Sequence, residues 1–199
     1  MDRATPHTTL RIIRQEHHCL AAVIKAMQHF THQIAAGGKA PDLKVFRAML
    51  LYISEYPEKV HHPKEDHFLF APLRLRTHAI DDTIAALEVQ HAQGERMVRE
   101  LEHALARYEL MDEASGLTFC ALVDQYAAFY FEHMTLEEDI VLPAAAAHLS
   151  EQDWAAADAA FATNRDPLVG ADLGADFDRL FSLITTITPA PIGVGPEVE

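Results

Sequence analysis

The sequence has little of what marks secreted or membrane proteins. Two cysteines, Cys19 and Cys120, are too few for a disulfide framework, and the polar N-terminal sequence MDRATPHTTL contains no apolar signal region. The longest apolar runs, such as residues 140–147, fall well short of a transmembrane span. We therefore expect a protein of the reducing cytoplasm that does not insert into a membrane.

Positive charge is also scarce. The chain has 16 Lys and Arg residues against 30 Asp and Glu residues, and its formal net charge is -14. No basic run offers phosphate groups a binding surface, so we expect neither a nucleic-acid partner nor binding to an anionic membrane. Small molecules and metal ions are the expected partners.

Two further absences concern the fold and the cofactor. No segment alternates apolar and polar residues for long enough to predict a β-strand, and no glycine-rich loop predicts a nucleotide or flavin site. A chain of 199 residues is nevertheless long enough to bury a full core. The expected protein is therefore all-α, with one domain and an appendage.

Histidine, by contrast, is abundant, with 13 residues in the chain. Two of them begin the same short pattern: Glu65 follows His61, and Glu137 follows His133, each in the order His-x-x-x-Glu and each with an apolar pair at the same later offset. On an α-helix, a four-residue step places both side chains on one face, one turn apart. Two such helices facing one another would surround a pair of metal ions with nitrogen and oxygen ligands, a set that suits iron.

Apolar residues at helical spacing predict four long helices, over about residues 8–36, 42–70, 81–110 and 117–142. Pro57 and Pro63 predict a kink or a restart in the second helix. The polar residues 111–116 predict the turn before the fourth. Helices of roughly 25 to 30 residues joined by short turns predict an up-down-up-down four-helix bundle, over residues 8–149.

Residues 150–199 form a predicted C-terminal helical extension that packs on the bundle. The sequence Ser150-Glu151-Gln152-Asp153 predicts a capping box at the start of a short helix that ends near Asn164. A second amphipathic helix is expected over about residues 175–188. The remaining residues are rich in proline and glycine and predict an irregular tail.

Two more histidines have the register of inward-facing residues. His17 shares its helix face with apolar residues of the first helix, whereas its neighbour His18 shares a face with basic residues and should point outward. His91 lies on the apolar stripe of the third helix. Each predicted helix thus supplies one inward histidine, and two of the helices add a glutamate.

Ferritin-like carboxylate proteins are a structural alternative, because they also hold two irons inside four helices, through Glu-x-x-His motifs. Such triplets occur in this chain, but Tyr130 occupies the place where a glutamate would have to precede His133. The nitrogen-rich His-x-x-x-Glu interpretation is therefore preferred.

The combined pattern resembles the hemerythrin-like (HHE cation-binding) family. The segments that carry the resemblance are EHHCL in the first helix, HHPKED in the second, EVQHAQGE in the third and EHMTLEEDIVLP in the fourth. Members of this family fold as four-helix bundles with a non-haem di-iron centre. The resemblance implies two iron ions joined by an oxo or hydroxo bridge, with terminal histidines and two bridging carboxylates. The implied metal ligands are His17, His61, Glu65, His91, His133 and Glu137.

The ligand pair of the second helix stays open. Pro63 interrupts the register between His61 and Glu65. His62 with Asp66 is therefore a competing pair.

One position departs from the oxygen-carrying hemerythrins, which have a second histidine four residues after the helix-3 ligand. In this chain Glu95 stands four residues after His91. The departure weighs against reversible oxygen carriage, because it changes or empties one coordination position.

The resemblance implies a di-iron protein that binds or reacts with small oxidants such as oxygen, peroxide or nitric oxide, in a sensing or redox role. The alternative is an enzyme, either a peroxidase or oxidase or an iron donor for the repair of iron–sulfur clusters. A bundle stapled by structural metals is a second alternative, although structural sites are normally closed by protein ligands. Whether the protein forms a homodimer is left open by the sequence.

Overall fold

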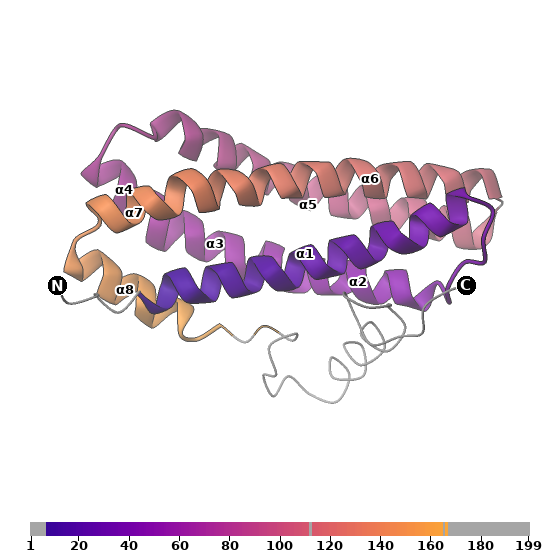
Figure 1. The fold of residues 1–199 in the computed structure, drawn as a ribbon, viewed down its shortest axis with the longest axis horizontal. Coiled ribbons are helices and arrows are strands. Elements are labelled where there is room, and N and C mark those ends of the chain that lie inside the picture. The colour runs from indigo at the N-terminus through magenta and orange to yellow at the C-terminus, as the bar shows by residue number, and fades with distance from the viewer. Residues whose placement is uncertain (1–6, 112, 165, 167–199) are drawn as a thin grey trace.

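The computed structural model describes residues 7–111, 113–164 and 166, and these residues contain helices and no strand. The all-α expectation is thereby confirmed for the described part of the chain. Figure 1 shows the long helices side by side along the longest axis of the molecule, with α8 folded against one end. No described helix is long and apolar enough to cross a membrane.

The first helix, α1 (Thr8–Ala35), ends within one residue of its predicted end, and the pair Gly37 and Gly38 follows shortly after. Gly37 follows it with a φ of +77°, a left-handed conformation that side chains with a Cβ rarely adopt. The buried residues of α1 recur at three- and four-residue spacing and include His17. Its buried face packs against α6 and α2.

The second helical segment runs without a loop from Lys44 to Arg76. It comprises α2 (Lys44–Glu55), the π-helical turn η1 (Pro57–His61), α3 (His62–Glu65), the π-helical turn η2 (Asp66–Phe70) and α4 (Ala71–Arg76). The kink or restart predicted at the prolines therefore takes the form of wide turns within one continuous helical segment.

A proline follows each π-helical turn two residues later, at Pro63, Pro72 and Pro143. In a regular α-helix, a proline lacks the donor for the carbonyl four residues back, and its ring collides with that carbonyl. A wider turn moves the carbonyl out of the way. Such turns are frequent at functional sites, and here they lie in the two segments that carry the His-x-x-x-Glu patterns.

The remaining long helices are α5 (Asp81–Leu110) and α6 (Glu113–Leu136), followed by the π-helical turn η3 (Glu137–Val141) and α7 (Leu142–His148). The turn predicted over residues 111–116 is wrong in length, because α6 already begins at Glu113. The two helices then lie close together: a Cβ at Gly116 would stand 2.6 Å from the Tyr108 ring. The α5 helix packs along both α6 and α2.

Two apolar clusters fill the interior, one towards each end of the helices. One cluster contains Leu20, Phe46, Leu101 and Phe119 with their neighbours, and the other contains Ile13, Leu69, Leu87 and Trp154 with theirs. On α1 and α5, the inward histidines lie in the sequence between the residues of one cluster and those of the other. A polar layer thus separates two apolar halves of the bundle.

The C-terminal helix α8 (Glu151–Phe161) begins with the predicted capping box. The Ser150 hydroxyl accepts from the Asp153 amide, and the Asp153 carboxylate accepts from the Ser150 amide. The helix packs on α1, where the Thr9 amide and hydroxyl donate to Asp158 at 2.8 and 2.7 Å. The predicted helix at 175–188 and the tail lie outside the described residues.

Candidate metal centre

Seven buried side chains of the polar layer lie close enough together to hold metal ions. The five histidines and two glutamates are His17, His61, His62, Glu65, His91, His133 and Glu137. They form two groups, one of His17, His61, Glu65 and Glu137 and the other of His62, His91 and His133, and within each group the possible ligand atoms lie within 4.8 Å of one another. Imidazole nitrogen and carboxylate oxygen are ligands that suit iron.

Each glutamate faces histidines of both groups. The distances from histidine Nε2 to a carboxylate oxygen are 3.2 Å for His17 and Glu137, 3.2 Å for His133 and Glu137, 3.3 Å for His61 and Glu65, and 3.8 Å for His91 and Glu65. Both carboxylates therefore occupy the boundary between the groups, which is the place a bridging carboxylate would take between two ions.

Several inward-facing atoms have no hydrogen-bond partner among the described residues. They are Nε2 of His91 and His133, Oε2 of Glu65 and both carboxylate oxygens of Glu137. A buried polar atom left in this state costs about 1–3 kcal/mol. Cations placed among these atoms would remove that cost, so the donor set fits metal ions.

The other ring nitrogen of every histidine, Nδ1, faces an acceptor. The acceptors are Glu16 for His61 at 2.6 Å, Asp66 for His91 at 2.9 Å, Gln90 for His133 at 3.0 Å, Glu138 for His17 at 2.9 Å and Glu58 for His62 at 3.3 Å. An acceptor at Nδ1 holds the proton there and leaves Nε2 free to bind a metal. All five imidazoles are thus oriented with Nε2 inward.

Four of these acceptors connect the helices in a closed ring. Each is the sequence neighbour of a buried cluster residue on its own helix, and each serves a histidine on the next helix: Glu16 of α1 serves His61, Asp66 of η2 serves His91, Gln90 of α5 serves His133, and Glu138 of η3 serves His17. The orientation of each histidine therefore depends on the placement of a neighbouring helix.

The carboxylates strongly perturb the histidines. Burial lowers the pKa of His17, but the nearby carboxylates of Glu137 and Glu138 outweigh this and raise the pKa to about 9. Burial likewise opposes protonation of His91, yet Asp66 and Glu137 raise its pKa to about 10. These histidines carry protons at neutral pH when no metal is bound, and those protons neutralise the buried carboxylates.

Glu137 is stabilised as an anion within the cluster. Burial would raise its pKa, but the charges of the nearby imidazoles, with His133 foremost, hold the pKa well below its ordinary value. Burial and the neighbouring His91 also hold the pKa of His62 well below the ordinary range, and for a histidine this favours the neutral form. The cluster therefore contains an ionised carboxylate and a neutral imidazole, both in the state that binds metal.

Tyr130 and Glu58 lie beside the His62 group. The Tyr130 hydroxyl donates to the Glu58 carboxylate, and burial raises the pKa of Glu58 to about 7 despite this hydrogen bond. Gly94 makes the arrangement possible, because a Cβ there would stand 2.6 Å from the Tyr130 hydroxyl and 3.1 Å from a Glu58 oxygen.

The two competing ligand pairs of the second helical segment, His61 with Glu65 and His62 with Asp66, do not exclude one another in the structure. His61 lies with Glu65 in one group, and His62 lies in the other group, while Asp66 accepts from His91. Adjacent residues of an α-helix point about 100° apart, but the π-helical turn that ends at His61 reduces this angle. Both neighbours, His61 and His62, therefore face the interior, each 3% exposed.

Glu95 does not reach the cluster. Its side chain is 62% exposed and pairs with Arg99 at 2.7 Å. Glu95 therefore lies outside the cluster, and the fifth imidazole of the cluster is that of His62. His18 is exposed, as its register predicts.

A depression of about 390 Å³ lies at the surface next to His17. Residues of α1, α6 and η3 line it: Arg14, His17, His18, Ala21, Phe131, Met134, Thr135, Glu138 and Asp139. Of the seven cluster residues, His17 alone contributes to its lining. The depression therefore borders the group that holds two histidines.

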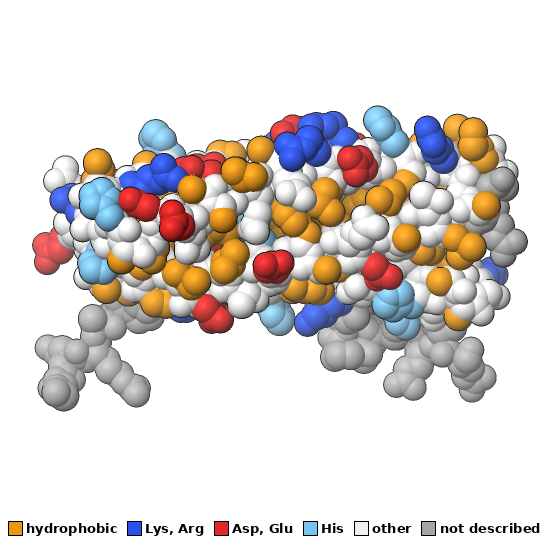
Figure 2. All heavy atoms as spheres, turned by 90° about the horizontal axis from the view of Figure 1, so that it is seen from above, with side chains coloured by type: hydrophobic (Ala, Val, Ile, Leu, Met, Phe, Trp, Pro, Cys, Tyr) orange, Lys and Arg blue, Asp and Glu red, His pale blue; other side chains and the backbone are white. Residues whose placement is uncertain are grey.

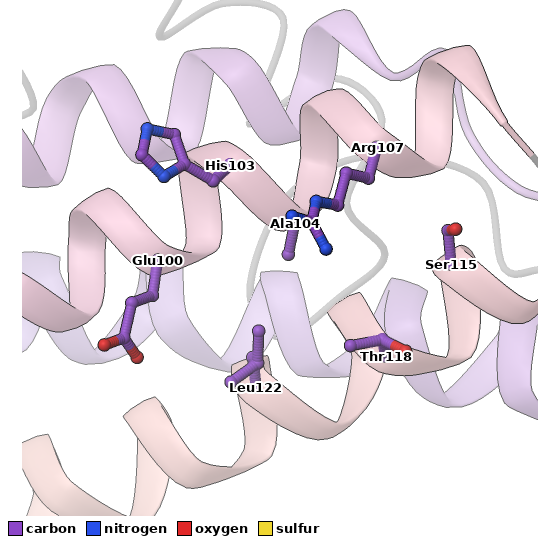
Figure 3. Close-up of a pocket in the computed structure, with 7 residues that line it drawn as sticks. All are labelled: Glu100, His103, Ala104, Arg107, Ser115, Thr118 and Leu122. Atoms are coloured by element: carbon purple, nitrogen blue, oxygen red, sulfur yellow. The ribbon is translucent and has the colours of Figure 1, made fainter.

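A second cavity, of about 280 Å³, lies between α5 and α6 (Figure 3). It is lined by Glu100, His103, Ala104, Arg107, Ser115, Thr118 and Leu122. Its α5 residues lie 9 to 16 positions beyond His91, or roughly 14–24 Å along the helix axis. It is therefore separate from the metal cluster.

On the face shown in Figure 2, acidic and basic side chains are interspersed with apolar ones.

Comparison with known proteins adds one match. The family model for the hemerythrin HHE cation binding domain matches residues 8–145. No curated protein matches the chain. The matched residues include all seven side chains of the cluster and end before α8.

Proposed function

Because the chain belongs to the hemerythrin HHE cation-binding family, we propose that its buried cluster holds two iron ions within an up-down-up-down four-helix bundle. We propose further that this centre binds or reacts with small oxidants such as oxygen, peroxide or nitric oxide. The observation that carries the proposal is the convergence of five oriented imidazoles and two carboxylates whose inward atoms include several without a hydrogen-bond partner. Iron would supply reversible redox chemistry and an affinity for such ligands.

The number of protein donors favours a reactive site over a structural one. His62, His91 and His133 would serve one ion, and His17 and His61 the other, with both glutamates shared. Two octahedral ions offer about twelve positions. The protein and a solvent-derived bridge would fill about eleven of them, which would leave one position on the two-histidine side for a small molecule.

The remaining residues orient the ligands and control access. The ring of Nδ1 acceptors fixes the imidazoles, and the two apolar clusters exclude water from both ends of the layer. A small oxidant would enter through the depression beside His17, on the side with the open position.

Turnover of peroxide is the second candidate function, and Glu58 favours it. A carboxyl group with a pKa of about 7, joined to the Tyr130 hydroxyl and the His62 imidazole, holds and releases a proton near neutral pH. Reduction of peroxide consumes protons, so a group of this kind next to the centre suits an enzyme.

The proposal is tested with protein reconstituted anaerobically with ferrous iron. Addition of oxygen, peroxide or nitric oxide should each change the optical spectrum within the mixing time of the oxidant. Repeated peroxide consumption by a small amount of protein would support the enzymatic candidate over simple binding. Protein that takes up iron but stays spectrally unchanged with all three oxidants would contradict the proposed function.

Blocking the depression should slow these reactions without removing iron. Ala21→Trp places a large ring in the depression, so we expect azide binding and the oxidation of ferrous iron by peroxide to slow severalfold while the iron content stays that of the wild type. Stopped-flow absorbance measures both rates. Ala22→Trp, one residue along α1 and outside the depression, is the matched control. If Ala21→Trp reacts as fast as Ala22→Trp, entry occurs elsewhere.

A further inference from the structure

Glu16 differs from the other carboxylates of the ring in its burial. The side chains of Asp66 and Glu138 are 42% and 40% exposed, so water can solvate their charge. The side chain of Glu16 is only 6% exposed. A buried carboxylate stays ionised only if protein groups donate hydrogen bonds to it.

Three side chains donate to Glu16. The His61 Nδ1 and the Tyr56 hydroxyl each lie 2.6 Å from one of its oxygens, and the Asn164 amide nitrogen lies 2.9 and 3.2 Å from the two oxygens. These donors outweigh the effect of burial and leave the pKa of Glu16 below its ordinary value. Two of them belong to the bundle, but Asn164 follows α8, beyond the residues that the family match covers.

Asn164 is held in place by the second helical segment. The Lys64 ammonium group donates to the Ala160 carbonyl at 2.9 Å, to the Thr163 hydroxyl at 2.9 Å and to the Asn164 amide oxygen. The amide of Asn164 therefore accepts from Lys64 at one end and donates to Glu16 at the other. This arrangement connects the C-terminal segment to the layer that contains His61.

We propose that Asn164 is a positioning residue of the metal centre, through which the C-terminal segment fixes Glu16 and, through Glu16, the metal-facing nitrogen of His61. The inference rests on the proposed metal site. His61 belongs to the group with only two histidines, so misorientation of His61 removes a larger share of the ligands there than on the other side. The ion on that side should therefore be the one that depends on Asn164.

The test is an anaerobic titration of the full-length metal-free protein with ferrous iron against a competing chelator. Asn164→Ala should weaken the binding of one ion by roughly tenfold, the scale for loss of an outer hydrogen bond at a metal site, and leave the other ion unchanged. Asn164→Asp should weaken it further, because a carboxylate replaces the donor next to Glu16. Thr163→Ala, which removes another partner of Lys64 but no donor to Glu16, should match the wild type.

Melting of the metal-free variants separates positioning from general stabilisation. If Asn164→Ala lowers the melting temperature of the metal-free protein but leaves both iron affinities at wild-type values, the positioning role is refuted. Tyr56→Phe removes a donor to Glu16 from within the bundle and should weaken the same ion, so the test stands even if Asn164→Asp fails to fold. A wild type that binds no iron would instead overturn the proposed function, and the inference with it.

Discussion

Glu137→Gln should leave the protein almost without bound iron after anaerobic reconstitution and desalting. Glu137 lies 3.2 Å from both His17 and His133 and therefore faces both groups of ligands. The glutamine side chain has nearly the same shape as glutamate, but an NH₂ group replaces one of the two carboxylate oxygens. This group is a donor that cannot bind a cation, and it would point towards neighbouring imidazoles. Both ions should be lost, because each would lose a shared ligand. Iron per folded chain is the measured quantity.

The matched control for this substitution is Glu95→Gln. The chemical change is the same, but Glu95 is exposed and pairs with Arg99 outside the cluster. It should keep the iron content of the wild type. Circular dichroism of both variants checks that the helices form. Full iron content in folded Glu137→Gln protein would exclude Glu137 as a shared ligand.

Iron affinity should rise continuously as the pH increases from 6.5, the ordinary value for histidine, to about 9. Without metal, interactions with carboxylates raise the pKa of His17 to about 9 and that of His91 to about 10. Iron must displace the protons that these histidines carry at neutral pH. Each proton released changes the affinity by about tenfold per pH unit. Chelator-buffered ferrous titrations across this range measure the slope, and an affinity already constant above pH 6.5 would contradict the prediction.

The stability of the metal-free protein should depend on pH in the opposite sense. A raised histidine pKa stabilises the folded state fully below the unfolded value of 6.5, and this contribution is lost as the pH rises through about 9 to 10. The lowered pKa of Glu137 stabilises the fold above its unfolded value of 4.5, and this contribution is lost at lower pH. The melting temperature of the metal-free protein should therefore be highest between these two unfolded values and should fall towards alkaline pH.

The helical periodicity of the sequence predicts most of the cluster. His17 and His91 lie in register with apolar residues, and the repeated His-x-x-x-Glu spacing singles out His133 and Glu137. These predictions depend only on the regular geometry of an α-helix, and the structure brings all four residues into the buried layer. Whether they bind iron stays a prediction until metal is measured.

The sequence indicates His62 only as an alternative to His61, since a regular helix does not direct two adjacent side chains to one point. The wide turn that admits Pro63 changes this geometry locally. A prediction from helical periodicity assumes a constant angle per residue, so it cannot detect such a turn. The proline two residues after the turn is the one signal in the sequence that accompanies it.

The acceptors of the ring were not predicted, because each serves a histidine on another helix. Glu16, Gln90 and Glu138 stand next to cluster residues in the sequence, but their function depends on how far the helices are rotated and shifted relative to one another. Polar residues beside each predicted ligand would have been the signal to examine. The contact of Asn164 with Glu16 spans 148 residues, and no local pattern indicates it.

Iron content combined with Mössbauer spectroscopy of the air-oxidised protein is the decisive measurement. Two ions sharing Glu65 and Glu137 should give about two irons per chain and the signature of coupled ferric pairs, with no signal from isolated ferric ions in electron paramagnetic resonance. A single iron per chain in fully reconstituted protein, or two ions that behave as isolated ferric centres, would contradict a shared site built from the two glutamates.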